Sequence, residues 1–178
     1  MSPLEVTPSQ TVGPFFSIGL PWTEGPFVVG EDDPGAVIIS GVVLDGEGAP
    51  IPDAMIETWQ PDAHGAFGEH EGFRGFARAS TDDTGRFAIR TVKPGSVPDP
   101  AGVPQAPHID VSLLGRGLLN RVVTRIYFAD EQSANAADPT LARIPADRRD
   151  TLLAAPTDDG YRFDIHLQGD GETVFFDV

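Results

Sequence analysis

The chain has 178 residues and a formal net charge of −15, with 12 lysine and arginine residues against 27 aspartate and glutamate residues. Such an acidic surface repels phosphate groups, which argues against binding to nucleic acid or to an anionic membrane. The sequence contains no cysteine, so disulfide bonds and thiolate metal ligands are excluded. The length fits one domain, and the start, Met1-Ser-Pro-Leu-Glu-Val, lacks the basic and apolar parts of a signal peptide, which favours a cytoplasmic location.

The first 35 residues are predicted to form an irregular arm. Prolines recur too often there for a helix or a central strand: Pro3, Pro8, Pro14, Pro21, Pro26 and Pro34. The same stretch carries large apolar residues: Phe15, Phe16, Ile18, Leu20, Trp22 and Phe27. A solvated tail would not hold so much apolar surface, so we expect the arm to pack on its own domain or on a second chain.

Residues 36–178 are predicted to form one β-sandwich, because short apolar stretches alternate with turn residues. The expected strands are 36–44, 54–60, 76–80, 86–92, 108–114, 121–128, 161–168 and 172–177. The turn Thr81-Asp-Asp-Thr-Gly85 predicts that the third and fourth of these strands pair as a hairpin. Asp138-Pro139 and the stretch 146–154 predict one or two short helices near 131–154.

Few residues could bind a metal ion. His64 and His70 lie in a glycine-rich loop at a spacing that matches no zinc motif, and His166 faces away from the apolar side of its strand, so we expect all three to be exposed. His108 and Asp110 share one face of a strand and could supply two ligands. Without a third ligand, a structural hydrogen bond between them is favoured.

Arg125 lies on the same strand face as Val123 and Tyr127. An arginine among apolar neighbours is usually paired within the protein, or it faces a pocket or an interface. The sequence leaves these two alternatives open. Motifs for a serine nucleophile, a phosphate-binding loop or a dinucleotide are absent.

Several segments together resemble the intradiol ring-cleaving dioxygenases, and the resemblance runs nearly from end to end. The central segments are Gly41-Val-Val-Leu-Asp-Gly, Ala54-Met-Ile-Glu-Thr-Trp-Gln-Pro-Asp-Ala-His-Gly, Thr81-Asp-Asp-Thr-Gly-Arg-Phe and Thr91-Val-Lys-Pro-Gly. The others are Thr7-Pro-Ser-Gln-Thr-Val-Gly-Pro14, Ala106-Pro-His-Ile-Asp110, Thr124-Arg-Ile-Tyr-Phe128, Tyr161-Arg-Phe-Asp-Ile and Gly169-Asp-Gly-Glu-Thr-Val-Phe-Phe-Asp-Val. The resemblance implies a β-sandwich and an enzyme that inserts dioxygen between two hydroxylated ring carbons, using non-haem Fe(III) held by two tyrosines and two histidines.

The same resemblance places the four ligand positions at Phe67, Val97, His108 and Asp110. Three of the four ligands are therefore replaced, and phenylalanine and valine have no donor atom. The family includes enzymes built from two related chains, of which the α chain is a sandwich without iron. The resemblance thus implies an iron-free α subunit whose homologous β chain binds the Fe(III). The two chains would form a 1:1, higher-order αβ assembly that cleaves protocatechuate with O2 to 3-carboxy-cis,cis-muconate.

The resemblance also implies roles for individual residues of this chain. The arm 1–35 would pack on the partner chain, where Thr11, Gly13 and Pro14 would form part of the wall of the substrate pocket. Arg125 would act as a catalytic residue by stabilising the anionic substrate or product through charge-assisted hydrogen bonds.

Two points stand beside these expectations. Phe15 occupies a position where an aromatic hydroxyl is common in such chains, so a hydrogen bond from that position is lost.

The alternative function is a non-enzymatic β-sandwich binding or accessory module, since sandwiches with similar motifs also serve in that way. The end-to-end match speaks against this alternative.

Overall fold

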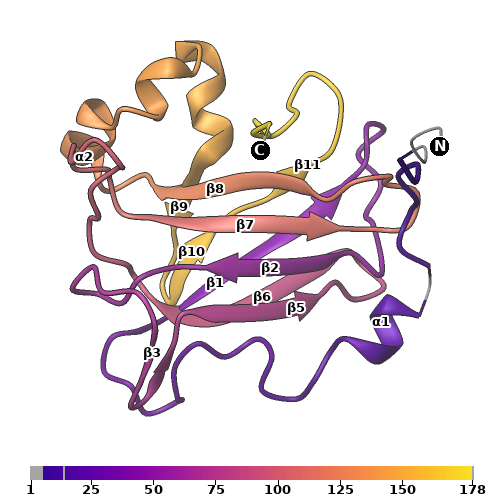
Figure 1. The fold of residues 1–178 in the computed structure, drawn as a ribbon, viewed down its shortest axis with the longest axis horizontal. Coiled ribbons are helices and arrows are strands. Elements are labelled where there is room, and N and C mark those ends of the chain that lie inside the picture. Colours follow the sequence, from indigo (N-terminus) through magenta and orange to yellow (C-terminus); the bar gives the residue numbers. More distant parts are fainter. Residues whose placement is uncertain (1–5, 14, 178) are drawn as a thin grey trace, which may run out of the picture.

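The computed structural model describes residues 6–13 and 15–177, and strands dominate it (Figure 1). The strands are β1 (Ala36–Leu44), β2 (Met55–Trp59), β3 (Glu69–His70), β4 (Phe73–Arg74), β5 (Phe76–Ser80), β6 (Arg86–Val92), β7 (His108–Leu114), β8 (Val122–Phe128), β9 (Leu153–Pro156), β10 (Gly160–Arg162) and β11 (Ile165–His166). The helical elements are α1 (Phe16–Gly19), α2 (Gln132–Ala137) and the 3-10 helices η1 (Leu141–Arg143) and η2 (Ala146–Leu152). No helix in the described ranges has both the length and the apolar character that crossing a membrane requires.

The main strands form one curled sheet whose two halves face each other (Figure 1). One half is ordered β5-β2-β7-β8 through antiparallel pairs, and the other half centres on β1, which pairs with β6 on one side and with β10 and β11 on the other. The short strand β9 joins the halves, because it pairs with β8 and with β10. The predicted all-β sandwich is confirmed, with its two layers belonging to one continuous sheet.

The main core lies between the two halves of the sheet. Side chains alternate along each strand, so every second residue points inward. Ile39 of β1, Ile89 of β6, Ile109 of β7 and Ile126 of β8 are each 1% exposed and belong to one cluster. A smaller cluster, which includes Tyr127 and Leu152, lies where residues 138–152 cover the outer face of β8. The one or two short helices expected near 131–154 are found as three, α2, η1 and η2, of which η1 and η2 form this cover.

The second half of the arm packs on its own domain. Val28 and Val29 are buried in the main core, where the backbone N–H of Val28 donates to the carbonyl of Arg90 in β6. Trp22 stacks on Phe76 of β5 with a centroid distance of 6.3 Å. Residues 22–29 therefore lie across the open side of the curl, between the edges of β5 and β6.

The predicted hairpin between β5 and β6 is wrong. β5 pairs with β2 and β6 pairs with β1, so the chain crosses from one half of the sheet to the other between them. The turn itself is well formed, since the Asp82 carboxylate accepts hydrogen bonds from the backbone of Thr84 and Arg86. Turn residues specify that the chain reverses but not which strand it pairs with afterwards.

The predicted strand 161–168 is interrupted at Phe163 and Asp164, where it passes β1. The carbonyl of Phe163 lies directly over Gly41, so that a Cβ built on Gly41 would be 1.8 Å from that oxygen. The Asp164 carboxylate accepts the N–H of Val42 in place of a backbone carbonyl. Because a side-chain carboxylate takes the place of a backbone acceptor in the hydrogen-bond ladder, the strand is divided into β10 and β11.

The predicted strand 172–177 is also wrong, because this segment forms no regular ladder. It instead runs along β8, where the N–H of Phe176 donates to the carbonyl of Val123 and the Thr124 hydroxyl donates to the carbonyl of Val174. Isolated hydrogen bonds of this kind hold an extended segment in place without making it a strand. The segment covers part of the outer side of β8.

We predict that Gly41→Ala destabilises the protein by on the order of 3 kcal/mol, because the added methyl group forces β11 away from β1. Urea denaturation monitored by tryptophan fluorescence measures the free energy of unfolding. Gly30→Ala is the matched control, since a Cβ at Gly30 meets nothing within 4 Å. Equal stability of the two variants would contradict this account of the strand break.

Candidate functional site

The two expected tyrosine positions carry side chains without donor atoms. Phe67 is 50% exposed and stacks on Trp59 of β2 with a centroid distance of 6.1 Å. Val97 is buried, and its carbonyl accepts the N–H of Gln105. Both positions are therefore occupied by packing interactions.

The two expected histidine positions lie on the outer face of β7. His108 is buried, its Nδ1 lies 2.8 Å from the carbonyl of Ala106, and its ring tilts against Tyr127 of β8. Asp110 accepts a hydrogen bond from Nε of Arg125 at 2.8 Å. The predicted hydrogen bond between His108 and Asp110 is wrong, because each of the two side chains has another partner.

Fe(III) held by two tyrosines and two histidines does not fit these residues. Phe67 and Val97 offer no ligand atom, and the Asp110 carboxylate is engaged by a cation. Over the described ranges, no group of three or more histidine, cysteine, aspartate or glutamate side chains could hold a metal ion.

Arg125 is held by three side chains of its own chain. Its Nε donates to Asp110, and one of its Nη atoms donates to Gln105 at 2.8 Å and to the Tyr127 hydroxyl at 3.4 Å. Burial alone would lower the pKa of Arg125, but the hydrogen bond to Tyr127 and the charge of Asp110 outweigh it and raise that pKa. Burial also raises the pKa of Tyr127 to about 12. Arg125 is thus a permanent cation in an internal network.

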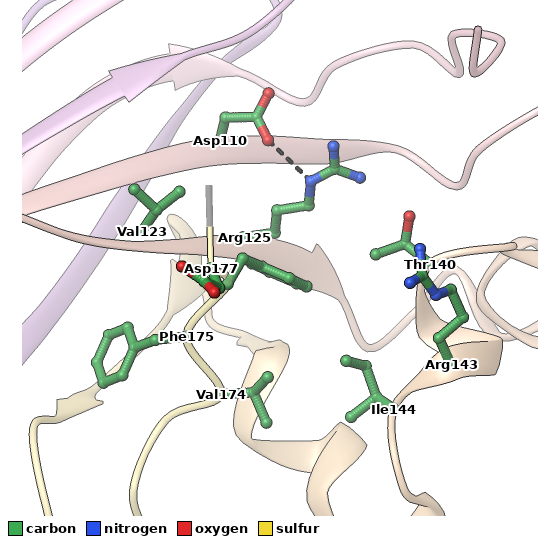
Figure 2. Close-up of a pocket in the computed structure, with 10 residues that line it drawn as sticks. Asp110, Val123, Arg125, Thr140, Arg143, Ile144, Val174, Phe175 and Asp177 are labelled. Atoms are coloured by element: carbon green, nitrogen blue, oxygen red, sulfur yellow. Dashed lines mark hydrogen bonds and ion pairs between the residues drawn. The ribbon is translucent and has the colours of Figure 1, made fainter.

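The same arginine also lines a cavity of about 480 Å³ (Figure 2). The cavity lies between the outer face of β7 and β8, η1 and the C-terminal segment. Its lining is Asp110, Val123, Arg125, Thr140, Arg143, Ile144 and residues 174–177. Arg125 is therefore both paired within the chain and part of a pocket. Both of the alternatives that the sequence leaves open apply.

Thr11 and Gly13 lie elsewhere on the molecule. The Thr11 hydroxyl accepts the N–H of Gly117 at 2.9 Å, in the turn between β7 and β8. Gly13 is exposed, and Pro14 lies outside the described residues. Residues 10 and 12 line a different cavity from that of Arg125. Among the described residues, Thr11 and Gly13 are thus not brought next to Arg125.

Arg116 lies beside the contact between Thr11 and Gly117. The sequence alone does not single it out. Arg116 precedes Gly117, its side chain is 53% exposed, and it forms an ion pair with Asp53. The signal in the sequence is only an arginine between two glycines in a turn, which is common on any protein surface.

The remaining histidines lie outside this region. His64 is exposed and His70 is half-exposed beside Asp62, whereas His166 is partly buried.

Comparisons with known proteins place the chain in a family. The dioxygenase family model Dioxygenase_C matches residues 12–169. The chain belongs to the intradiol ring-cleaving dioxygenase family. It is 43% identical to the protocatechuate 3,4-dioxygenase α chain of Burkholderia cepacia, with 100% of both chains covered, and 43% identical to that of Pseudomonas putida, with 98% and 97% covered.

Two further comparisons are more distant. The protocatechuate 3,4-dioxygenase β chain of Burkholderia cepacia is 32% identical over 75% of this chain and 64% of its own length. The dioxygenase domain of a carbohydrate-binding fusion protein from Streptomyces sp. SirexAA-E has the same fold, with a TM-score of 0.60 and 23% identity over 92% of this chain and 99% of that one. The chain is thus similar both to α chains and, over less of its length, to a β chain of protocatechuate 3,4-dioxygenase.

We predict that His108 makes the protein less stable in mild acid. Burial, followed by the nearby charge of Arg125, lowers the pKa of His108 from its ordinary value of 6.5. The unfolded chain then takes up a proton near pH 6.5 that the folded chain binds only at lower pH. This contribution is fully present above about pH 6.5 and is lost as the pH falls toward the folded pKa.

Urea denaturation at pH 7.5 and pH 5.5 tests this prediction. His108→Phe should lower the stability at pH 7.5, because the Ala106 carbonyl loses its donor, but should reduce the further loss at pH 5.5. The exposed His64→Asn is the control and should keep the pH dependence of the unchanged chain. A His108→Phe protein with the same loss between the two pH values would refute the assignment.

Proposed function

We propose that this chain is the iron-free α subunit of a heteromeric protocatechuate 3,4-dioxygenase. The observation that carries the proposal is the replacement of three ligands at Phe67, Val97 and Asp110 in a chain that is similar over its full length to such α chains. In this proposal a homologous β chain binds the Fe(III), and the assembly cleaves protocatechuate with O2 to 3-carboxy-cis,cis-muconate. A cytoplasmic location belongs to the same proposal.

The arm 1–35 contacts the partner chain in this proposal, and residues 36–178 form the single sandwich domain. The support is an apolar surface at the start of the described arm. Phe15 is 78% exposed, Ile18 is 75% exposed and Leu20 is 42% exposed, all in or beside α1. Covering such a surface with a second chain removes apolar area from water, which favours association.

The contribution of this chain to the partner's substrate pocket is a cation and a stretch of backbone. Thr11, Gly13 and Pro14 would supply the backbone wall, and Arg125 would supply the charge that stabilises the anionic substrate or product. Arg116 is a second candidate for that charge, because it adjoins the contact between Thr11 and Gly117 and is the more exposed of the two arginines.

A non-enzymatic binding module is disfavoured. The similarity to subunits of an oxidoreductase covers all of the chain and includes the arm. An accessory sandwich would need only the core motifs between β1 and β6. No feature of the described residues favours the module over the subunit.

The proposal predicts different properties for the chain alone and for the chain produced with its β partner. Alone, it should contain no stoichiometric iron and should not consume O2 with protocatechuate. With the partner, it should co-purify in equal amounts, show the visible absorption of Fe(III)–tyrosinate and cleave protocatechuate. Stoichiometric iron together with turnover in the lone chain would overturn the proposal.

Substitution of the two arginines tests which one serves the partner's pocket. Arg125→Ala in the assembled enzyme is predicted to lower kcat/KM for protocatechuate by about 10- to 100-fold with unchanged iron content, roughly the effect of losing one preorganised charge. Arg116→Ala should have the same effect if the cation beside the arm is the one in use. Arg162→Ala is the control, because Arg162 also pairs with an aspartate but lies on β10. Kinetics equal to those of the control would leave Arg125 with a structural role alone.

A further inference from the structure

We propose that Arg78 of β5 is a positioning residue, which fixes where the start of the arm lies and thereby where Thr11 and Gly13 meet the partner chain. The contacts of Arg78 with the arm belong to this chain alone, whereas its effect on the partner's substrate pocket rests on the proposed function. A continuous chain of hydrogen bonds from β5 to Gly13 supports this role.

The middle of the arm lies against β5, the edge strand of its half of the sheet (Figure 1). The backbone N–H of Arg78 donates to the carbonyl of Gly25, and the N–H of Gly25 donates to the carbonyl of Trp22. A Cβ built on Gly25 would be 2.7 Å from the carbonyl oxygen of Arg78, so only glycine permits this close approach. Main-chain contacts therefore hold this part of the arm whatever side chain stands at position 78.

The side chain of Arg78 holds the part of the arm that comes before. Its guanidinium carbon lies over the Trp22 ring at 5.3 Å from the centroid, and that of Arg74 lies over the same ring at 5.3 Å. Phe76 stacks on the ring as well. Cations are attracted to the face of an indole ring. Three side chains from β4 and β5 therefore hold Trp22 in place.

A further hydrogen bond connects Arg78 to the end of α1. One Nη of Arg78 donates to the carbonyl of Leu20 at 3.1 Å. The N–H of Leu20 donates to the carbonyl of Phe16, and the N–H of Phe16 donates to the carbonyl of Gly13. These bonds run through a single short helix, so a displacement of Leu20 moves Gly13 with it.

Glu57 of β2 orients Arg78 for this contact. The Glu57 carboxylate accepts hydrogen bonds from Nε of Arg78, at 2.7 Å, and from the second Nη. The first Nη is then directed to Leu20. Only the rigid fork of a guanidinium group can serve both acceptors while its plane lies over a ring, so neither lysine nor glutamine replaces it.

The beginning of the described arm has its own attachment. The Thr11 hydroxyl accepts the N–H of Gly117 in the turn between β7 and β8. The stretch 11–20 is therefore held at both ends by the sandwich of the same chain. Such a stretch is in place before a partner binds, which lowers the entropy cost of association. Loss of the Arg78 contact would leave it held at one end.

The first experiment measures the arm in the lone chain. Trp59→Phe leaves Trp22 as the single tryptophan. In this background, Arg78→Gln should raise the rate constant for acrylamide quenching of Trp22 fluorescence about twofold, because the ring loses a cation that covers it. Glu57→Gln is the matched control, since it removes the ion pair but keeps an oxygen that accepts from Arg78. It should leave the quenching unchanged.

The second experiment measures turnover of protocatechuate by the chain assembled with its β partner. Arg78→Gln should raise KM about tenfold and leave kcat within about twofold, the pattern of a loss in substrate binding. A merely structural role would instead reduce the amount of active enzyme and hence kcat. Glu57→Gln should keep both constants, as should Arg86→Gln at an exposed position of β6.

Arg78→Lys carries both experiments if Arg78→Gln does not fold. It keeps a cation near Trp22 but has no fork, so its quenching and its KM should lie between those of the unchanged chain and of Arg78→Gln.

Equal quenching of Trp22 in the Arg78→Gln and Glu57→Gln proteins would overturn the placement of the arm by Arg78. A KM that both substitutions raise equally, or that neither raises, would overturn the positioning role, as would a fall in kcat alone. If the unchanged chain with its partner does not turn over protocatechuate, the proposed function fails. The quenching of Trp22 then decides by itself whether Arg78 places the arm.

Discussion

The buried carboxylate of Asp138 holds together the part of the molecule that contains Arg125 and the cavity beside it. It is 0% exposed, and it accepts hydrogen bonds from the N–H groups of Ala106, Thr140 and Leu141 and from the hydroxyl of Tyr127. A buried carboxylate is tolerated only when such donors replace its water. These four bonds tie η1 to β8 and to the approach to β7. The cavity wall and the orientation of the Arg125 network therefore depend on one side chain.

The four positions that the resemblance marks as ligand positions make ordinary contacts in this chain. Phe67 stacks on the ring of Trp59, and Val97 is buried. His108 keeps its ring but uses Nδ1 for a backbone carbonyl. Asp110 binds an arginine instead of a metal ion. Each of these four positions is thus occupied by an ordinary packing or pairing interaction.

Most strands were predictable from the sequence, because period-2 alternation and turn residues are local signals. β1, β5, β6 and β7 begin and end where the pattern predicts. The errors concern features that depend on distant residues. The hairpin prediction failed because pairing partners are set by the curl of the whole sheet. The strand 161–168 was predicted without a break because neither the approach of Phe163 to Gly41 nor the role of Asp164 as a ladder acceptor has a local signature.

The candidate site was predictable only in part, for the same reason. The shared face of His108 and Asp110 follows from strand geometry, but their separate partners come from a preceding loop and from β8. The placement of Arg125 in a network with Gln105 was not visible, because the two are 20 positions apart and meet only when β7 and β8 pair. Arg143 and Asp177 both line a cavity that exists only when η1 and the C-terminal segment fold over β8.

The ion pair between Asp110 and Arg125 also bears on whether an iron site could be introduced into this chain. Exchanging Phe67, Val97 and Asp110 for two tyrosines and a histidine would supply the missing donor atoms. The same exchange would strip Arg125 of its carboxylate and leave a permanent cation next to the place for a trivalent metal ion. Repulsion at such short range is severe in a partly buried site. Placing a trivalent metal ion at these positions therefore requires the removal of a positive charge together with the gain of three ligands.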